Sequence, residues 1–500
     1  MTEPELEEDS TVPSSDGTTV GDDASTTSVC REKARLLYRG VALAPMVRAS
    51  TTPLRILALQ YGANFTYTEE LVDRSLSETI RVKNKDLQTI DYIKDPSKLS
   101  KKTRKKLARD NNRPCLILRI DPNIEKGKLI CQLGTGEPEL ALEAAKRVVG
   151  DVDGIDINMG CPKKFSVSGG MGSALLKDPD RAARILQTLK KELLGPLGKP
   201  LSCKIRLLAT TQKTVDFVER MIRAGADAVA IHSRRVGHDP TFAADWKTLE
   251  EVLGVLRAKY PDFNFLVNGD FYDRKERAEF IARTKVDGFL LGRPALYNTS
   301  TFLPLTKTSS STVTTTPLVD KTAVVQEYIR HSVRYDSHYK NTKYVVCEMM
   351  THRRTPTGRV PYMSLSFPQG QTIKKTCDCR DMASLCQVWN VDYSKAVAQS
   401  AIGTKNISEC TTNNSSVTTL VAGEHRYEDS YFLKRGGENT NDIHEATEIE
   451  EKKTDDGKLE AQSRTHKKRS SSDQNDGGDN DNNANKRTKV LQEGSTQPSI

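Results

Sequence analysis

One stretch of the chain combines a reactive side chain with the backbone geometry that would present it. Residues 154–158 read as a short buried strand, and Met159-Gly160-Cys161-Pro162 follows at once. Gly160 tolerates backbone angles that other residues avoid, and Pro162 cannot continue a strand, so a tight turn is expected. Cys161 would then lie just beyond a strand end, where a parallel barrel carries its chemistry. The alternative is an inert buried thiol, the default for a cysteine.

Two glycine-containing turns further along the chain read as an anion site. The seventh strand candidate ends in Asn268-Gly269-Asp270, and the eighth ends in Gly292-Arg293. The loops after strands seven and eight are the common phosphate site of a (β/α)8 barrel. Glycines let backbone N–H groups approach an anion, and the Arg293 guanidinium offers two parallel donors. The joint pattern predicts the phosphate of a mononucleotide cofactor, although each glycine alone is also ordinary turn chemistry.

Polar and charged side chains occupy the other expected strand ends. If the ligand is FMN, Lys204 would stabilise the negative charge of the reduced flavin, whereas without a ligand it would form a salt bridge inside the barrel. Gln132 and Asn158 would hydrogen-bond the ring edge or a substrate base. The strand-end set comprises Pro45, Met46, Val47, Gln132, Asn158, Lys204, Arg206, His232, Arg234 and Arg235.

The segment from residue 34 to 305 alternates short apolar runs with amphipathic stretches of helical length, which predicts an α/β fold with a (β/α)8 barrel. A doubly wound sheet usually carries a glycine fingerprint after its first strand, where this chain has Ala44-Pro45-Met46-Val47. Thr214 and Asp273 are expected helix caps. Strands are expected at 41–46, 65–68, 130–133, 154–158, 201–205, 228–232, 265–268 and 288–291, and helices at 53–60, 137–149, 178–194, 214–224, 246–259 and 274–283.

An additional segment interrupts this repeat between the second and third barrel strands. Residues 115–120 read as half of an extra hairpin, and residues 73–91 as partly helical. Residues 98–109 contain seven basic residues and no acidic one. Such a run is either a solvated surface loop or a phosphate-binding patch, and the sequence leaves both open.

The regions outside the barrel differ from it in composition. Residues 1–33 are acidic and rich in Ser and Thr, so a disordered leader is expected. Residues 306–320 read as a Ser/Thr linker, 321–405 as a smaller all-helical domain and 406–500 as a low-complexity tail. Basic and aromatic residues interleave in the helical part, which suits contact with nucleic acid, although an ordinary helical cap on the barrel is the alternative.

Composition sets wider limits on the class of protein. The 75 basic and 66 acidic residues give a formal net charge of +9, which is compatible with a polyanionic substrate. The ten cysteines are spread as reduced thiols usually are, and the cluster of Cys377, Cys379 and Cys386 lacks the spacing of a metal site, so no metal is expected. No run suits a membrane span, and the acidic N-terminus resembles no targeting signal, so a cytoplasmic or nuclear address is expected.

Nine short motifs, in order and at barrel spacing, resemble the tRNA-dihydrouridine synthase family. They are APM at 44–46, TEE at 68–70, CQLGT at 131–135, DINMGCP at 156–162, GGMG at 169–172, CKIR at 203–206, AIHSRR at 230–235, NGD at 268–270 and GRP at 292–294. Residues 333–344 are similar to the helical domain of the eukaryotic branch that modifies position 20 of the tRNA D-loop. The resemblance covers residues 35–400.

This resemblance implies a two-step flavin reaction, with tRNA and a nicotinamide dinucleotide as partners. NADPH or NADH would reduce FMN, the flavin would give a hydride to C6 of a uridine, and Cys161 would protonate C5. An ordinary thiol, with a pKa of about 8.5, is protonated at neutral pH and able to donate. We expect a monomer, although the sequence does not fix the oligomeric state, and no membrane partner, because no run is long and apolar enough to span a membrane. Asn158, Arg234 and Arg235 would hold the uracil, and FMN would contact Pro45, Met46, Val47, Gln132, Lys204, His232, Asn268, Gly269, Asp270, Gly292 and Arg293.

The chain departs from the family pattern in two places. Animal members of this branch carry a double-stranded-RNA-binding domain after the helical domain, whereas only low complexity follows residue 400 here. The basic residues 98–109 look like an addition. We hypothesise that they supply phosphate contacts to the tRNA.

Two other functions are compatible with parts of the sequence. One is an FMN barrel oxidoreductase acting on a free pyrimidine, of the dihydroorotate dehydrogenase kind; the helical part and the basic run argue against it, because a small substrate needs neither. The other is a non-catalytic tRNA-binding protein on a decayed barrel. The presence of Cys161, Lys204, His232 and Arg293 argues against decay.

Overall fold

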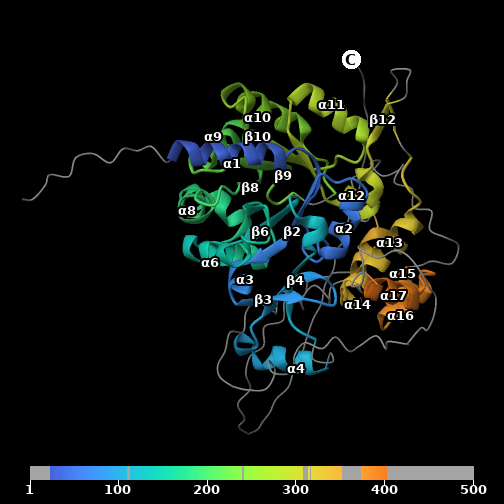
Figure 1. Cartoon of the computed structure of the whole chain (residues 1–500). Helices are drawn as coiled ribbons and strands as arrows, with labels where there is room; N and C mark the ends of the chain where they lie inside the picture. Colours follow the sequence, from blue (N-terminus) through green and yellow to red (C-terminus); the bar gives the residue numbers. More distant parts are fainter. Residues whose placement is uncertain are drawn as a thin grey trace, which may run out of the picture. The chain divides into compact units, whose positions relative to one another are not determined.

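The computed structural model describes residues 23–109, 113–238, 241–307, 313–315, 317–351 and 373–402. Eight parallel strands close into a barrel in the order β1-β11-β10-β9-β8-β7-β6-β2 (Figure 1), which confirms the predicted fold. All eight predicted strands are present, two of them with the predicted bounds. They are β1 (Gly40–Leu43), β2 (Phe65–Val72), β6 (Leu129–Gly134), β7 (Gly154–Asn158), β8 (Leu201–Leu207), β9 (Ala228–Arg235), β10 (Asn264–Asn268) and β11 (Gly288–Leu291).

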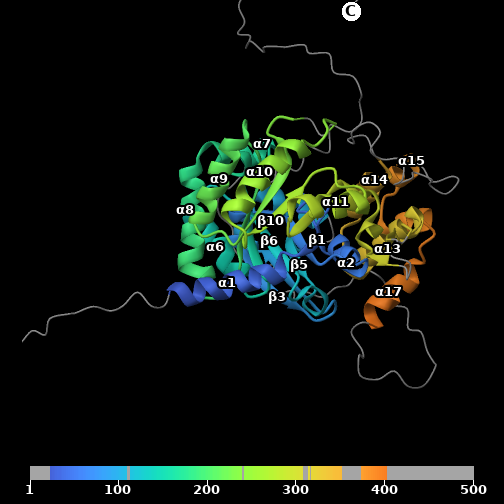
Figure 2. The same cartoon turned by 90° about the horizontal axis from the view of Figure 1, so that it is seen from above.

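The predicted helices surround the strands, as Figure 2 shows for α6, α8, α9 and α10. In α8 the buried residues Ala182, Ile185, Leu186 and Leu189 recur at the spacing of one helix face, so this face packs on the barrel. The helices are α2 (Thr52–Gln60), α6 (Pro138–Val148), α8 (Pro179–Leu189), which continues as a π-helical turn (Lys190–Leu194), α9 (Thr211–Arg223), α10 (Trp246–Lys259), α11 (Arg274–Thr284) and α12 (Arg293–Tyr297).

Of the two predicted helix caps, one is confirmed and one is wrong. Asp273 forms a full capping box with Glu276 at the start of α11. Helix α9 begins earlier than predicted, and Thr210 caps it by accepting a hydrogen bond from the Lys213 N–H. Thr214 is buried inside the first turn, where its hydroxyl donates to the Thr210 carbonyl at 3.0 Å.

Side chains fill the inside of the barrel and leave no pore. Phe65 and Tyr67 on β2 lie among small residues such as Ala42 and Ala230 from the facing strands. Below them Tyr38 sets its ring edge against Phe65, with ring centroids 6.0 Å apart. Because the barrel centre is packed, a ligand can enter only at the mouth formed by the carboxyl ends of the strands.

Helix α1 (Asp23–Leu37) corrects the expected disordered leader, because residues 23–33 are helical. Cys30, Ala34 and Tyr38 are fully buried, and they follow one another at a spacing of four residues. This apolar stripe was missed because charged residues lie between its members and the acidic, Ser- and Thr-rich residues before it dominate the composition. Residues 1–22 of the leader lie outside the described residues.

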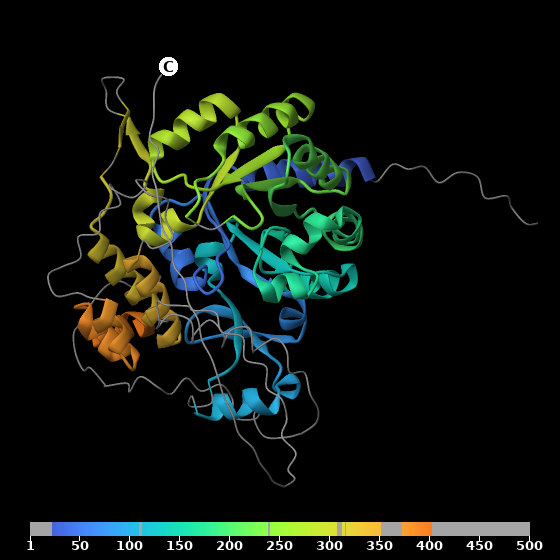
Figure 3. The ribbon, with the colours of Figure 1, turned by 180° about the vertical axis from the view of Figure 1, so that it is seen from behind.

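The extra segment between β2 and β6 is a three-stranded antiparallel sheet with the order β3-β4-β5. The expected hairpin strand is β5 (Leu116–Ile120), and its partner β4 (Thr89–Lys94) also pairs with β3 (Thr79–Asn84). Short helices α3 (Asp73–Ser77) and α5 (Pro122–Glu125) flank the sheet. Residues 101–109 are helical and do not form a loop: a 3-10 turn (Pro96–Lys98) leads into helix α4 (Lys101–Arg109), seen beyond the sheet in Figure 1 and Figure 3. The choice between a solvated surface and a phosphate-binding patch stays open at this point.

The expected linker also contains regular structure. Strands β12 (Leu305–Lys307) and β13 (Val313–Thr315) form an antiparallel pair. Thr and Val favour strands, so this Ser/Thr segment can form a short hairpin. The 3-10 helix Thr299–Phe302 precedes them.

The residues that follow are helical, as predicted, in α13 (Lys321–Arg334), α14 (Tyr339–Met350), α15 (Ile373–Asp378), α16 (Met382–Val388) and α17 (Tyr393–Ile402). His331 Nε2 lies 2.7 Å from Gln60 Oε1 of α2, and Tyr335 donates its hydroxyl proton to Asp121 at 2.6 Å. These bonds attach the helices to the barrel and the inserted sheet. The predicted tail, 406–500, lies outside the described residues, and no described helix has the length and apolar character of a membrane span.

Candidate active site

Cys161 lies at the mouth of the barrel, directly after β7, as predicted. The Asn158 side-chain oxygen accepts hydrogen bonds from the backbone N–H groups of Gly160 and Cys161, both at 3.0 Å. This side-chain turn fixes the backbone that carries the thiol. Gly172 (φ +58°) packs against it, and a Cβ there would lie 3.0 Å from the Cys161 Cβ and 2.6 Å from its carbonyl oxygen. A side chain at position 172 would therefore displace Cys161.

A buried hydrogen-bond chain orients Asn158 from below. Asp156 accepts from Ser202 Oγ at 2.6 Å and from Gln132 Nε2 at 2.7 Å. Gln132 in turn accepts from Asn158 Nδ2 at 3.2 Å. Burial raises the pKa of Asp156 to about 6. Two predicted ligand-contacting amides, Gln132 and Asn158, are thus tied to each other and to the Cys161 turn.

Glu70 of β2 was not among the predicted site residues, yet its carboxylate lies beside the Cys161 thiol. Its Oε1 accepts from Ser166 Oγ at 3.1 Å, and its buried Oε2 has no hydrogen-bond partner in the described structure. The predicted second strand stopped at Thr68. The real β2 continues to Val72, with a register shift between Tyr67 and Glu70 that re-aims the side chains.

The environment keeps Cys161 protonated. Burial, followed by the negative charge of Glu70, raises the pKa of the thiol to about 12. The thiol is therefore protonated at neutral pH, as expected already from the ordinary pKa of a thiol. Burial also raises the pKa of Glu70, with opposing contributions from Ser166 and Lys163.

Basic side chains gather on the neighbouring strands. Burial lowers the pKa of Lys204 to about 8, and its Nζ forms no hydrogen bond or ion pair with the described residues. Arg206 points to the same face of β8, where Nε donates to the Gly160 carbonyl at 2.8 Å. Burial, then Arg234, lowers the pKa of Arg206 to about 10. Arg206 appeared in the strand-end set but not as a ligand contact, although its period-two spacing from Lys204 was the available signal.

His232 is a neutral imidazole in this setting. Burial lowers its pKa well below the ordinary value, and the charges of Lys204, Arg206, Arg234 and Arg293 lower it further. These four cations therefore surround the ring. A neutral ring can donate one hydrogen bond and accept another.

The two predicted phosphate turns adopt unusual backbone geometry. A Cβ on Gly269 (φ +122°) would collide with the Ser233 hydroxyl, and one on Gly292 would lie 3.6 Å from Met46 Sδ. The turns after β1, β10 and β11 therefore meet at one side of the mouth. Pro45, Met46 and Val47 are half-buried there, and Asn268 Nδ2 donates to the Leu290 carbonyl at 2.6 Å.

Asp270 ties this side of the mouth together. Its two oxygens accept from Arg293 at 2.6 Å and Arg234 at 2.5 Å, and the Ala244 N–H donates to it at 2.9 Å. Arg234 also donates to the Phe242 carbonyl and is only 3% exposed. Arg235 points elsewhere, to Asp245 at 2.9 Å. The observed bonds of both arginines are with protein groups, so their contact with uracil stays a prediction.

Comparison with known proteins decides the family of this barrel. A sequence profile described as "Dihydrouridine synthase (Dus)" matches residues 42–360. The chain belongs to the dihydrouridine synthase family. The Schizosaccharomyces pombe "tRNA-dihydrouridine(20) synthase [NAD(P)+]" is 39% identical over 313 residues, 62% of this chain and 59% of that relative. The Saccharomyces cerevisiae protein of the same description is 34% identical over 319 residues, 63% of this chain and 78% of the relative.

A second kind of dihydrouridine synthase is less similar. The S. pombe "tRNA-dihydrouridine(16/17) synthase [NAD(P)(+)]" is 31% identical over 291 residues, 57% of this chain and 62% of that relative. The chain thus spans about three fifths of the length of the two S. pombe relatives.

The cations and glycine turns of this mouth suit an anionic ligand. The Nζ of half-buried Lys204 has no hydrogen bond or ion pair in the described part of the chain, so a ligand anion beside it would stabilise its charge. The glycine turns and Arg293 lie where a phosphate is bound in such barrels. In the described part of the chain no three metal-ligating side chains gather.

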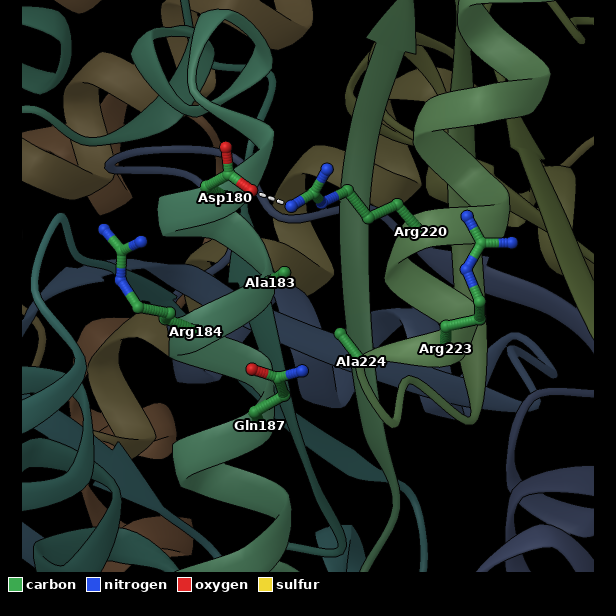
Figure 4. Close-up of a pocket in the computed structure, with 7 residues that line it drawn as sticks. All are labelled: Asp180, Ala183, Arg184, Gln187, Arg220, Arg223 and Ala224. Atoms are coloured by element: carbon green, nitrogen blue, oxygen red, sulfur yellow. Dashed lines mark ion pairs between the residues drawn. The ribbon is translucent and has the colours of Figure 1, made fainter.

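A hollow of about 380 Å³ lies elsewhere on the barrel, against the outer helices α8 and α9 (Figure 4). Its lining includes Arg184, Arg223 and an ion pair between Asp180 and Arg220. It contains none of the residues at the mouth.

Proposed function

We propose that this protein reduces the C5–C6 double bond of the uridine at position 20 of the tRNA D-loop. Family membership supports the reaction, and the identities of 39% and 34% to proteins named for position 20 support the position. The observation that carries the proposal is a protonated thiol, Cys161, in a mouth that also holds the half-buried cation Lys204.

The proposed cofactor is FMN, with NADPH or NADH as reductant, in line with the names of the relatives. FMN bound in the mouth supplies the hydride that is added to uracil C6. Lys204 would face the pyrimidine edge of the ring, and neutral His232 would hydrogen-bond the ligand without adding charge. Arg293 and the turns at Gly269 and Gly292 would hold the phosphate.

Cys161 would complete the reaction by giving its Sγ proton to C5. Lys204 and Arg206 favour the thiolate, since each interacts with the charge of Cys161. Glu70 opposes them from the other side. Burial is the larger cause that keeps the thiol protonated, and the charge of Glu70 adds to it against the neighbouring Lys163. Glu70 therefore acts as a positioning residue for the proton.

The target base must leave the tRNA stack to reach the mouth, as in other enzymes that act on bases. Asn158, Arg234 and Arg235 stay the proposed uracil contacts. The oxygen of Asn158 accepts from the Cys161 turn, and one of its two Nδ2 hydrogens is donated to Gln132, so the second hydrogen is the one that would be donated to a uracil carbonyl.

The test uses the purified full-length chain, NADPH and tRNA from cells that lack this protein. Dihydrouridine is mapped by position after incubation, and flavin reoxidation is followed with tRNA or with a free pyrimidine such as orotate as oxidant. Dihydrouridine at position 20 and reoxidation by tRNA alone are expected. Reoxidation by orotate alone would replace the proposal with a free-pyrimidine reductase, and a protein without flavin would refute the redox function.

A further inference from the structure

Helix α4 concentrates positive charge between β4 and β5, beyond the inserted sheet (Figure 1). Six of its nine residues are Lys or Arg, and none is acidic. Lys101, Lys102 and Lys105 are exposed, whereas Thr103 is only 8% exposed. Arg104 donates to the Pro96 carbonyl at 3.3 Å and so ties the helix to the turn before it.

This arrangement is unfavourable for an isolated helix. Like charges at spacings of three and four residues each cost about 0.2–0.5 kcal/mol, and cations in the first turn oppose the helix dipole. Ser100 compensates in part, since its hydroxyl accepts from the Thr103 N–H at 3.1 Å. A bound polyanion would relieve the remaining repulsion.

The sheet that carries α4 is firmly attached. Arg119 of β5 pairs with Asp91 of β4 at 2.6 Å, with side chains 5% and 0% exposed, and Arg119 also donates to the Tyr335 carbonyl at the end of α13. Arg81 of β3 pairs with Asp151 of the barrel at 2.6 Å. The sheet is therefore fixed both to the barrel and to the helices after it, as a surface that positions a ligand requires.

We infer that α4 is a docking surface for the phosphate backbone of the tRNA substrate, away from the uridine in the mouth. The inference rests on the proposed function. Charge complementarity favours nucleic acid over protein, because α4 contains no aromatic residue of the kind that dominates protein interfaces. Lysines act as point charges on phosphates, so the contacts would add affinity without reading sequence.

The experiment compares two triple variants of the full-length chain. In the first, Lys101, Lys102 and Lys105 are changed to Gln; in the control, the exposed residues Lys191, Lys213 and Lys247 of the barrel helices are changed to Gln. Binding of fluorescent tRNA is measured by anisotropy from 50 to 300 mM KCl. Each lost phosphate contact lowers the slope of log affinity against log salt by about 0.7–0.9.

The α4 variant should lose about two units of slope and bind at least tenfold more weakly at 100 mM KCl, while the control keeps both within error. Its Tm should not fall, because charge repulsion is removed, and NADPH should reduce its flavin at the wild-type rate without tRNA. A wild-type salt slope in the α4 variant, or an equal loss of slope in the control, would overturn the inference. The proposed function would still stand in that case as long as the protein forms dihydrouridine. If the wild type forms no dihydrouridine and binds no tRNA, both fall.

Discussion

The mouth of the barrel and helix α4 both gather basic side chains, but Lys204 and Arg206 of the mouth are half-buried, whereas three lysines of α4 are exposed. Lys204 and Arg206 lie in the mouth with pKa values lowered to about 8 and about 10 by burial. The α4 residues Lys101, Lys102 and Lys105 are exposed to solvent. The same chemical groups therefore lie in a partly desolvated site at the mouth and in water on α4.

This difference teaches which charges serve chemistry and which serve affinity. In a buried site an electrostatic interaction is several times stronger than in water and is little screened by salt. A single charge such as Glu70 then adds measurably to the effect of burial on the pKa of its neighbour Cys161. On the surface each charge is weak and screened, so many are needed, and their effect is read in the salt dependence of binding.

The largest effect is expected at the thiol. Cys161→Ala should lower dihydrouridine formation by about 10²–10⁴-fold, the range for loss of a general acid, while flavin content and NADPH-driven flavin reduction stay within twofold of the wild type. Mass spectrometry of digested tRNA and stopped-flow absorbance measure the two. Product formation within tenfold of the wild type would exclude Cys161 as the acid.

Lys204→Met removes the buried charge at nearly constant shape. Flavin reduction should slow by about 10–100-fold, as expected when one preorganised electrostatic group is lost. The salt slope of tRNA binding should not change, which is the opposite of the result for α4. Lys204→Arg retains the charge and is the matched control; equal defects in both variants would point to packing instead of charge.

Glu70→Gln tests whether the negative charge of Glu70 raises the pKa of the Cys161 thiol. Removing the negative charge should lower the pKa of Cys161 by about one unit, since a like charge nearby raises a thiol pKa. Below that pKa the thiolate fraction then rises about tenfold, so iodoacetamide should modify Cys161 faster between pH 7.5 and 9.5.

Peptide mass spectrometry locates the modification at Cys161 without any need for tRNA. Glu139→Gln, on the exposed start of α6, serves as the control and should react like the wild type. An unchanged or slower reaction of the Glu70 variant would show that burial alone holds the proton.

The smallest effect is expected at the hydrogen bond that attaches the end of α13 to the inserted segment that carries α4. Tyr335→Phe removes the 2.6 Å bond to Asp121 and should cost about 1 kcal/mol, seen as a Tm lowered by roughly 2–4 °C. The salt slope should stay unchanged because Arg119 and Arg81 still hold the sheet. A changed slope at unchanged Tm would mean that this bond sets the position of α4.

Local patterns predicted the parts of the fold that depend on neighbouring residues. The bounds of β7 and β11 were correct because each is an apolar run closed by a turn residue. The cap at Asp273 was correct because its hydrogen bonds also join residues that are close in the chain. Errors arose where distant packing decides: α1 is helical because its stripe of Cys30, Ala34 and Tyr38 is buried, and Glu70 enters the site only through the register shift in β2.

The sequence by itself determined the alternation that closes the barrel, the turn that presents Cys161 and the chemical types at the strand ends. The tertiary structure decided which charges meet. Asp270 joins Arg293 to Arg234 across strands, and Glu70 reaches Cys161 from a distant part of the chain. Turns and helix caps depend on hydrogen bonds between residues that are neighbours in the chain. Desolvation and Coulomb forces act through space, so the pKa shifts of this site arise only once the barrel is closed.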